Sequence, residues 1–332
     1  MLAKRLAEVR HLLADGATGT NLFEMGLVSG EAPELWLDSH PGRIASLHRS
    51  FVDAGADIIL TNSFGGNARR LMLHDMQART RQLNTRAAEI AREVVDKAGR
   101  RVVIAGSVGP TGDLFVPLGV LTEAEAVAVF VEQIEGLKAG GADVIWIETM
   151  SAVEEMRAAA NAAATVGMPY TLTASFDTAG RTMMGLTPAA FVAFTETLDA
   201  KPLAIGSNCG VGASDLVFSV LGMTDAQPSC PVIAKANAGI PVFHGEHIHY
   251  SGTPELMADY VALSALAGAR IIGGCCGTSP AHLAAMRRAL DQLEDGPRPD
   301  IDSIVAKLGK LVAPPPAEGE VRVRRPSRRE RS

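Results

Sequence analysis

The sequence predicts an α/β protein with the architecture of a TIM (β/α)8 barrel, and three observations support this. In segments 51–64, 137–150 and 262–276, a helical pattern ends near a glycine and a run of β-branched apolar residues follows. Glycine ends helices because it adopts the left-handed conformation without strain, and continuous apolar runs are typical of strands buried in parallel sheets. Eight such alternating units fit into the chain, as the barrel requires.

Eight strands are expected, each an apolar run with glycine, proline or a polar residue at its boundaries. The expected strands cover residues 11–15, 56–64, 102–109, 143–150, 169–176, 203–210, 231–239 and 269–276.

Helical patterns fill most of the intervals between these strands. Thr122 is expected to cap one helix, because its hydroxyl can accept a hydrogen bond from a first-turn N–H. Pro254 and Pro280 are expected at the first position of two later helices, where a missing N–H costs nothing. A doubly wound open sheet is the alternative architecture, but no GxGxxG motif follows the first strand.

Composition limits the class of protein. The chain is 47% hydrophobic, which supplies a large core, and its net charge of −6 argues against nucleic acid as a partner. It lacks the ~18-residue apolar run of a transmembrane helix and the features of a signal peptide, so a cytoplasmic protein without a membrane partner is expected. The barrel is expected at 1–296, a short C-terminal helix at 297–312 and a disordered Pro/Arg-rich tail at 313–332.

Polar residues end several of the predicted strands. In a TIM barrel the carboxyl ends of the strands meet at one rim, where active sites lie. Asp15, Glu148 and Asn237 end the first, fourth and seventh strands. Cys209 ends the sixth strand and the pair Cys275 and Cys276 ends the eighth. We therefore expect three thiols to lie close together at this rim, although the two segments are far apart in the sequence.

Three clustered cysteines favour a zinc site, because thiolate is a soft ligand and three protein ligands leave a fourth position open. The glycines on both sides of Cys275 and Cys276 would let both face one ion. Three alternatives remain open at this point: tight apolar packing, a phosphate site at the following helix, and a redox pair. His244, His247 and His249 could also bind metal, but their segment is expected to be a solvated loop.

The motifs DGATGTNL, TNSFGGN, GSNCG and GGCCGTSPAHL together resemble the homocysteine S-methyltransferase family over residues 8–290. The family includes short bacterial betaine–homocysteine S-methyltransferases and the N-terminal homocysteine-binding module of cobalamin-dependent methionine synthase. The resemblance implies a TIM barrel that binds one Zn²⁺ per chain through Cys209, Cys275 and Cys276, and that transfers a methyl group to homocysteine to give methionine.

The resemblance also implies roles for residues around the metal. Glu148 would receive the ammonium of homocysteine, and the N–H groups of Gly16 and Ala17, which follow Asp15, would receive its carboxylate. Asn237 would orient ligands or loops. Trp36 would lie in a rim loop, where an aromatic face attracts a quaternary ammonium.

The donor implied most directly is glycine betaine. The alternatives are S-methylmethionine, or a methylated corrinoid protein that would make this chain one subunit of a split cobalamin-dependent methionine synthase. Two other functions stay open: a phosphate-binding lyase or aldolase that uses Lys235, which has no evident partner in the sequence, and a non-catalytic regulatory barrel. The sequence leaves open whether the chain forms a homo-oligomer.

Overall fold

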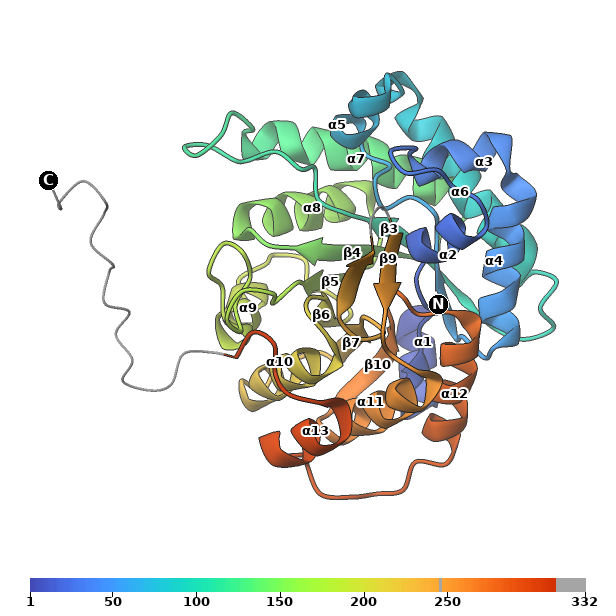
Figure 1. Ribbon diagram of the computed structural model, residues 1–332. Coiled ribbons are helices and arrows are strands. Elements are labelled where there is room, and N and C mark those ends of the chain that lie inside the picture. Colours follow the sequence, from blue (N-terminus) through green and yellow to red (C-terminus); the bar gives the residue numbers. More distant parts are fainter. Residues whose placement is uncertain (245–246, 315–332) are drawn as a thin grey trace, which may run out of the picture.

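Parallel strands alternate with helices along the chain, and the helices surround the strands (Figure 1). The computed structural model describes residues 1–244 and 247–314, with the backbone alone for 241–244 and 247–249. The strands of the large sheet are β1 Leu12–Leu13, β2 Ile58–Leu60, β3 Val103–Val108, β4 Val144–Met150, β5 Tyr170–Ala174, β6 Ile205–Cys209, β7 Val232–Ala236 and β10 Ala269–Gly274. Each lies within a predicted strand, so all eight are confirmed.

The sheet closes into a barrel. Its strands follow the order β1-β10-β7-β6-β5-β4-β3-β2, and every pair is parallel. The two ends meet at a bridge between Ala14 and Ile58. There the Asp15 N–H donates to the Ile58 carbonyl at 2.9 Å and the Asp57 N–H donates to the Leu13 carbonyl at 2.7 Å. The predicted TIM barrel is therefore the observed architecture.

The helices begin where the sequence indicates. Thr122 and Glu125 form a reciprocal capping box, and Pro254 and Pro280 occupy the first turn of their helices. The α-helices are α1 Leu2–Glu8, α2 Gly19–Glu24, α3 Trp36–Ser39, α4 Pro41–Asp53, α5 Ala68–Leu71, α6 Thr80–Val95, α7 Glu123–Ala139, α8 Val153–Val166, α9 Pro188–Thr195, α10 Ala213–Asp225, α11 Pro254–Leu266, α12 Pro280–Asp291 and α13 Ile301–Leu308; the 3-10 turns are η1 Pro33–Leu35, η2 Met72–His74 and η3 Gln77–Arg79.

Two apolar layers hold the barrel. The larger layer packs the strands against the surrounding helices, and the smaller fills the barrel with inward-facing side chains such as Leu12, Ile58, Val144 and Trp146. Leu2 of α1 packs against this inner layer. Because alternate residues of a strand face opposite sides, the inward series of β4 continues from Val144 and Trp146 to Glu148 at the carboxyl end. The apolar interior therefore gives way to polar side chains at this end.

A two-stranded antiparallel hairpin follows β7. Its strands are β8 Pro241–His244 and β9 His247–Tyr250. The sequence predicted a loop here, and this prediction is wrong because the two halves of the segment pair with each other. The side chains of His244, His247 and His249 lie outside the described residues.

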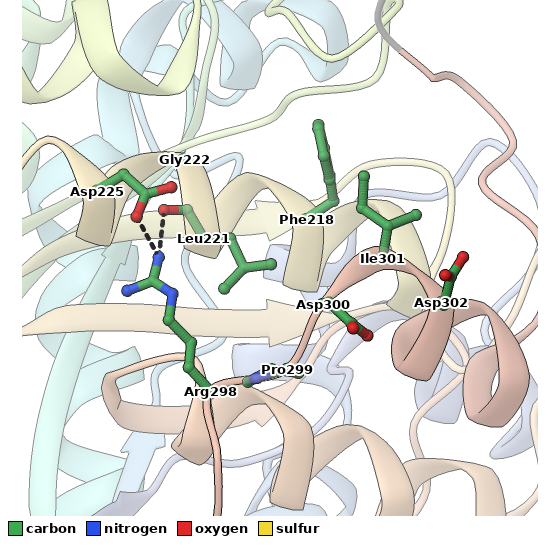
Figure 2. A pocket seen from close by; sticks show the side chains of 9 residues that line it. All are labelled: Phe218, Leu221, Gly222, Asp225, Arg298, Pro299, Asp300, Ile301 and Asp302. Carbon is green, nitrogen blue, oxygen red and sulfur yellow. Dashed lines mark hydrogen bonds and ion pairs between the residues drawn. The ribbon is translucent and has the colours of Figure 1, made fainter.

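The segment after α12 is attached to α10. Arg298 Nη2 donates to Asp225 Oδ1 at 2.6 Å and to the Leu221 carbonyl at 3.0 Å, at a hollow of about 520 Å³ (Figure 2). Asp215, in the first turn of α10, accepts the N–H groups of Val312 and Ala313. The tail predicted at 313–332 lies outside the described residues from residue 315 onward.

No helix in the described part of the chain is long and apolar enough to span a bilayer.

Candidate metal centre

Three cysteines gather at the carboxyl end of the barrel. Cys209 is the last residue of β6, and Cys275 and Cys276 follow the last residue of β10. Their sulfurs all lie within 4.8 Å of one another, and the Cys209 and Cys276 sulfurs are 3.8 Å apart. Because β7 pairs with β6 on one side and with β10 on the other, the sheet order brings the two segments together. Cys230 precedes β7 and is half-buried against the outer apolar layer.

Backbone conformation aims these thiols at one point. Cys209 has φ +62°, which is rare for a residue with a side chain, and Gly210 follows with φ +74°. Beyond β10 the chain turns, and the Thr278 N–H donates to the Cys275 carbonyl at 3.1 Å. Gly277 in this turn has φ +78°, and a Cβ there would lie 2.3 Å from the ring of Tyr250. The strand therefore ends before the cysteine pair, which frees both side chains from the alternation of a strand.

Asn237 joins the two cysteine segments. Its side-chain amide donates to the Gly210 carbonyl at 2.8 Å and accepts the Cys276 N–H at 3.0 Å. The side chain is 3% exposed. Asn237 thus connects the loops that carry the thiols and does not line the cavity beside them.

Asn208 organises the other side of the centre. Its carbonyl oxygen accepts the Thr149 N–H at 2.8 Å and the Thr173 hydroxyl at 2.7 Å. Its amide donates to the Thr149 hydroxyl at 2.7 Å, and lies 3.5 Å from Glu148 Oε2 and 3.9 Å from the Cys275 sulfur. Asn208 therefore connects the residue before Cys209 with the end of β4.

The proximity of the sulfurs changes their acidity. Hydrogen bonding to Cys275 and Cys276 raises the pKa of Cys209, whereas hydrogen bonding from Cys209 and Cys275 lowers the pKa of Cys276. Like charges this close disfavour one another, so the three sulfurs do not all ionise without a counter-charge. Chemically, the cluster is suited to a cation.

Glu148 faces the same cavity from the end of β4. Its side chain is 7% exposed, and Oε1 accepts a hydrogen bond from the Ser107 hydroxyl at 2.5 Å. Burial raises the pKa of Glu148 to about 7, although the positive charge of Lys235 acts in the opposite direction. The second oxygen, Oε2, has only the long 3.5 Å contact with the Asn208 amide, so this buried carboxylate is suited to a cationic ligand group.

Asp15 and Lys235 form a buried ion pair, with 2.8 Å between Asp15 Oδ1 and Lys235 Nζ. The second carboxylate oxygen accepts the Leu60 N–H at 2.7 Å. The side chains are 1% and 2% exposed. Lys235 was predicted to lack a partner, and this was wrong, because the two residues come together only across the barrel. Lys235 lines the cavity, whereas Asp15 does not.

Two further predictions need correction. The Ala17 N–H donates to the Thr278 carbonyl at 3.1 Å, so only Gly16 of the predicted N–H pair remains available without breaking that bond. Trp36 is 1% exposed, belongs to the outer apolar layer and does not line the cavity. The Arg43 guanidinium lies 4.9 Å above its ring. Trp36 is therefore a packing residue of α3.

The cavity has a volume of about 650 Å³, within the range of roughly 300–1,000 Å³ typical of small-molecule sites. The cysteines, Glu148 and Lys235 line one part of it. Three aromatic side chains that were not predicted also line the cavity: Phe23, Phe64 and Tyr250. The signal for Phe64 was the TNSFGG motif directly after the second strand. Tyr250 gave no signal, because the hairpin that carries it was not predicted.

Comparisons with known proteins agree with this arrangement. Residues 12–290 match the family described as homocysteine S-methyltransferase. The methionine synthase of Mycobacterium tuberculosis is 30% identical over 301 residues, covering 86% of this chain and 25% of that protein. The methionine synthase of Mycobacterium leprae is 30% identical over 315 residues, covering 90% of this chain and 26% of that protein. The chain thus spans about a quarter of the length of these relatives.

Among solved structures, the fold is similar to that of the homocysteine methyltransferase MmuM from Escherichia coli in its metallated form. The TM-score is 0.73 with 24% identity, and the match covers 86% of this chain and 99% of that chain. At this level of identity the similarity concerns the fold.

Proposed function

The chain belongs to the homocysteine S-methyltransferase family, and we propose that it transfers a methyl group to the sulfur of L-homocysteine, giving L-methionine. The observation that carries the proposal is the placement of three thiols and one buried carboxylate, Glu148, in the wall of the same cavity. A thiol substrate with an ammonium group matches this pair of features.

The residues fit one Zn²⁺ per chain, held by Cys209, Cys275 and Cys276. A tetrahedral site with Zn–S bonds of ~2.3 Å places its sulfurs about 3.8 Å apart. This is the separation of the Cys209 and Cys276 sulfurs. When bound, zinc would lower the pKa of the substrate thiol, which is ~8.5 in water, so that the sulfur is a nucleophile at neutral pH.

The other residues would bind and orient homocysteine. The ionised Glu148 would accept hydrogen bonds from the substrate ammonium, with Ser107 fixing the orientation of its carboxylate. The Gly16 N–H would donate to the substrate carboxylate. Asp15 would hold the turn that carries Gly16, because it is bonded to Lys235 and to the Leu60 N–H.

The methyl transfer balances as a displacement. A bond forms between the homocysteine sulfur and the methyl carbon while the bond from that carbon to the donor's positive nitrogen breaks. The electron pair of the broken bond stays on the nitrogen. With glycine betaine, the donor we propose, the products are methionine and N,N-dimethylglycine. The chain's residues need only bind and align the two reactants.

A second function is favoured by the two methionine synthase relatives. The chain would then be the homocysteine-activating subunit of a split cobalamin-dependent methionine synthase and would receive the methyl group from a corrinoid protein partner. S-Methylmethionine is the third candidate donor.

We also propose a cytoplasmic location, because a reducing compartment keeps the three thiols available to metal.

Methionine formation by the purified, zinc-loaded chain tests the proposal. The chain would be incubated with homocysteine and, separately, with glycine betaine, S-methylmethionine or a methylated corrinoid protein, and methionine would be measured by mass spectrometry. The triple variant Cys209→Ala, Cys275→Ala, Cys276→Ala is expected to lose bound zinc and activity together. Full activity in this zinc-free variant would refute the proposal.

A further inference from the structure

A second hollow, away from the cysteines, lies between α10 and the beginning of α13 (Figure 2). Its volume is about 520 Å³, and it shares no lining residue with the cavity beside the cysteines. Phe218 and Leu221 of α10 line it together with Ile301, the first residue of α13. Ile301 is 48% exposed, although its side chain is large and apolar. An exposed apolar surface rimmed by charged residues is typical of a place where another segment binds.

Acidic side chains surround this apolar surface. Asp225, Asp300 and Asp302 line the hollow, whereas Arg298 is the one basic residue among its described lining residues, so the lining has a net charge of −2. Arg298 Nη2 already donates to Asp225 Oδ1 at 2.6 Å, and Asp300 Oδ1 accepts the Ser303 N–H at 2.9 Å. Asp302 is exposed and makes no hydrogen bond or ion pair within the described part of the chain. The hollow therefore offers negative charge that its own residues do not balance.

The chain leaves the barrel close to this hollow. Val312 and Ala313 donate their N–H groups to Asp215, in the first turn of α10, at 2.9 and 2.8 Å. Asp225, at the other end of the hollow, lies ten residues further along the same helix, a distance of about 15 Å. The seven residues 314–320 span up to about 25 Å when extended. The residues from 321 onward can therefore reach the hollow.

The segment that follows has the complementary chemistry. Residues 321–331 read VRVRRPSRRER, with six arginines and one glutamate, a net charge of +5. Val321 and Val323 alternate with Arg322 and Arg324, so an extended chain would turn the two valines to one side and these arginines to the other. The segment thus matches the hollow both in charge and in its apolar side chains.

We propose that residues 321–325 bind in this hollow, with their two valines against Ile301 and their arginines beside Asp225 and Asp302. Exposed ion pairs are individually weak, so a separate basic peptide would bind poorly. Attachment through a short segment raises the local concentration to the order of millimolar, which favours the chain's own tail as the occupant. The bound segment would cover the apolar surface and hold α13 against α10.

Photo-crosslinking in the full chain locates the segment. The photoreactive amino acid p-benzoylphenylalanine would replace Ile301 or, as a control position, Val120, which is 83% exposed in the loop between β3 and α7. After irradiation at low salt, mass spectrometry should find position 301 joined to residues 321–332 of the same chain at least about fivefold more often than position 120. Crosslinks mainly between two chains would place a second copy in the hollow, and equal yields from both positions would show no preference. Either result would overturn the inference.

Charge reversal tests the recognition. Asp302→Lys should reduce the crosslink from position 301 about fivefold. Glu154→Lys is the matched control, because Glu154 is also an exposed acid in the first turn of a helix, α8, and it should leave the yield unchanged. Reversing both Arg324→Glu and Arg325→Glu should lower the yield as Asp302→Lys does, and combining all three changes should restore much of it. Equal losses from Asp302→Lys and Glu154→Lys would mean that only net charge matters, contrary to the inference.

Hydrogen exchange in α13 keeps the inference testable if the chain that carries the photoreactive residue folds poorly. In the chain without that residue, the pair Arg324→Glu and Arg325→Glu should speed amide exchange in residues 301–308 about threefold or more, because α13 loses the segment that covers it. Unchanged exchange would show that the tail does not bind there.

Discussion

Replacing Asn237 by alanine would remove both hydrogen bonds that join the cysteine segments. The bonds to the Gly210 carbonyl and the Cys276 N–H measure 2.8 and 3.0 Å and are buried. Each contributes about 0.5–1.5 kcal/mol, so the loss is about 1–3 kcal/mol. If that energy serves to place Cys209 and Cys276 before metal arrives, zinc affinity should fall about 10- to 100-fold, as it does when groups supporting metal ligands are removed.

Competition with a chromophoric zinc chelator would measure this affinity directly, without reference to activity. Asn84→Ala is the matched control, because the buried Asn84 side chain also makes two hydrogen bonds to the backbone, here to two carbonyls at 2.7 Å each, but lies away from the cysteines. Both variants should lose similar stability in urea, whereas only Asn237→Ala should lose zinc affinity. Wild-type zinc affinity in Asn237→Ala would refute the view that this residue preorganises the centre.

Other predictions follow from the same site. Because ionised Glu148 would bind the substrate ammonium, kcat/KM for homocysteine should rise with pH to a plateau above about 7, and Glu148→Gln should abolish this rise; an unchanged pH profile would count against the role. Lys235→Met should destabilise the chain by about 3–5 kcal/mol in urea by leaving Asp15 buried and unpaired, and adding Asp15→Asn should restore much of it; a loss below about 1 kcal/mol would contradict this. Cys209→Ser and Cys276→Ser should each reduce bound zinc in mass spectrometry under native conditions, and full retention would exclude that residue as a ligand.

The fold and the meeting of the three cysteines could be predicted because both depend on local patterns. Buried strands appear as continuous apolar runs, and parallel strands in a closed barrel bring their carboxyl ends to one rim. The proximity of Cys209 and Cys276 could therefore be predicted without any knowledge of side-chain contacts, although 67 residues separate them.

Pairings between side chains could not be predicted in this way. Lys235 and Asp15 are 220 residues apart, and no periodicity indicates that their side chains meet inside the barrel. Trp36 shows the same limit, because the direction of its ring depends on the packing of a short helix against its neighbours. Glu34 was not singled out in the sequence, and its burial is seen only in the structure, where it is 4% exposed and accepts the Gly65 N–H.

The placement of the proposed zinc ligands on β6 and after β10 has a consequence for biosynthesis. Cys276 is translated 67 residues after Cys209, a delay of roughly 3–13 seconds at ~5–20 residues per second. During that delay the nascent chain holds a single thiol of the cluster, which is too few to capture zinc. β10, which precedes the pair, is also the last strand of the barrel in the chain and lies between β1 and β7. We therefore expect the chain to bind metal only after the last strand of the barrel has been synthesised and has paired with its neighbours.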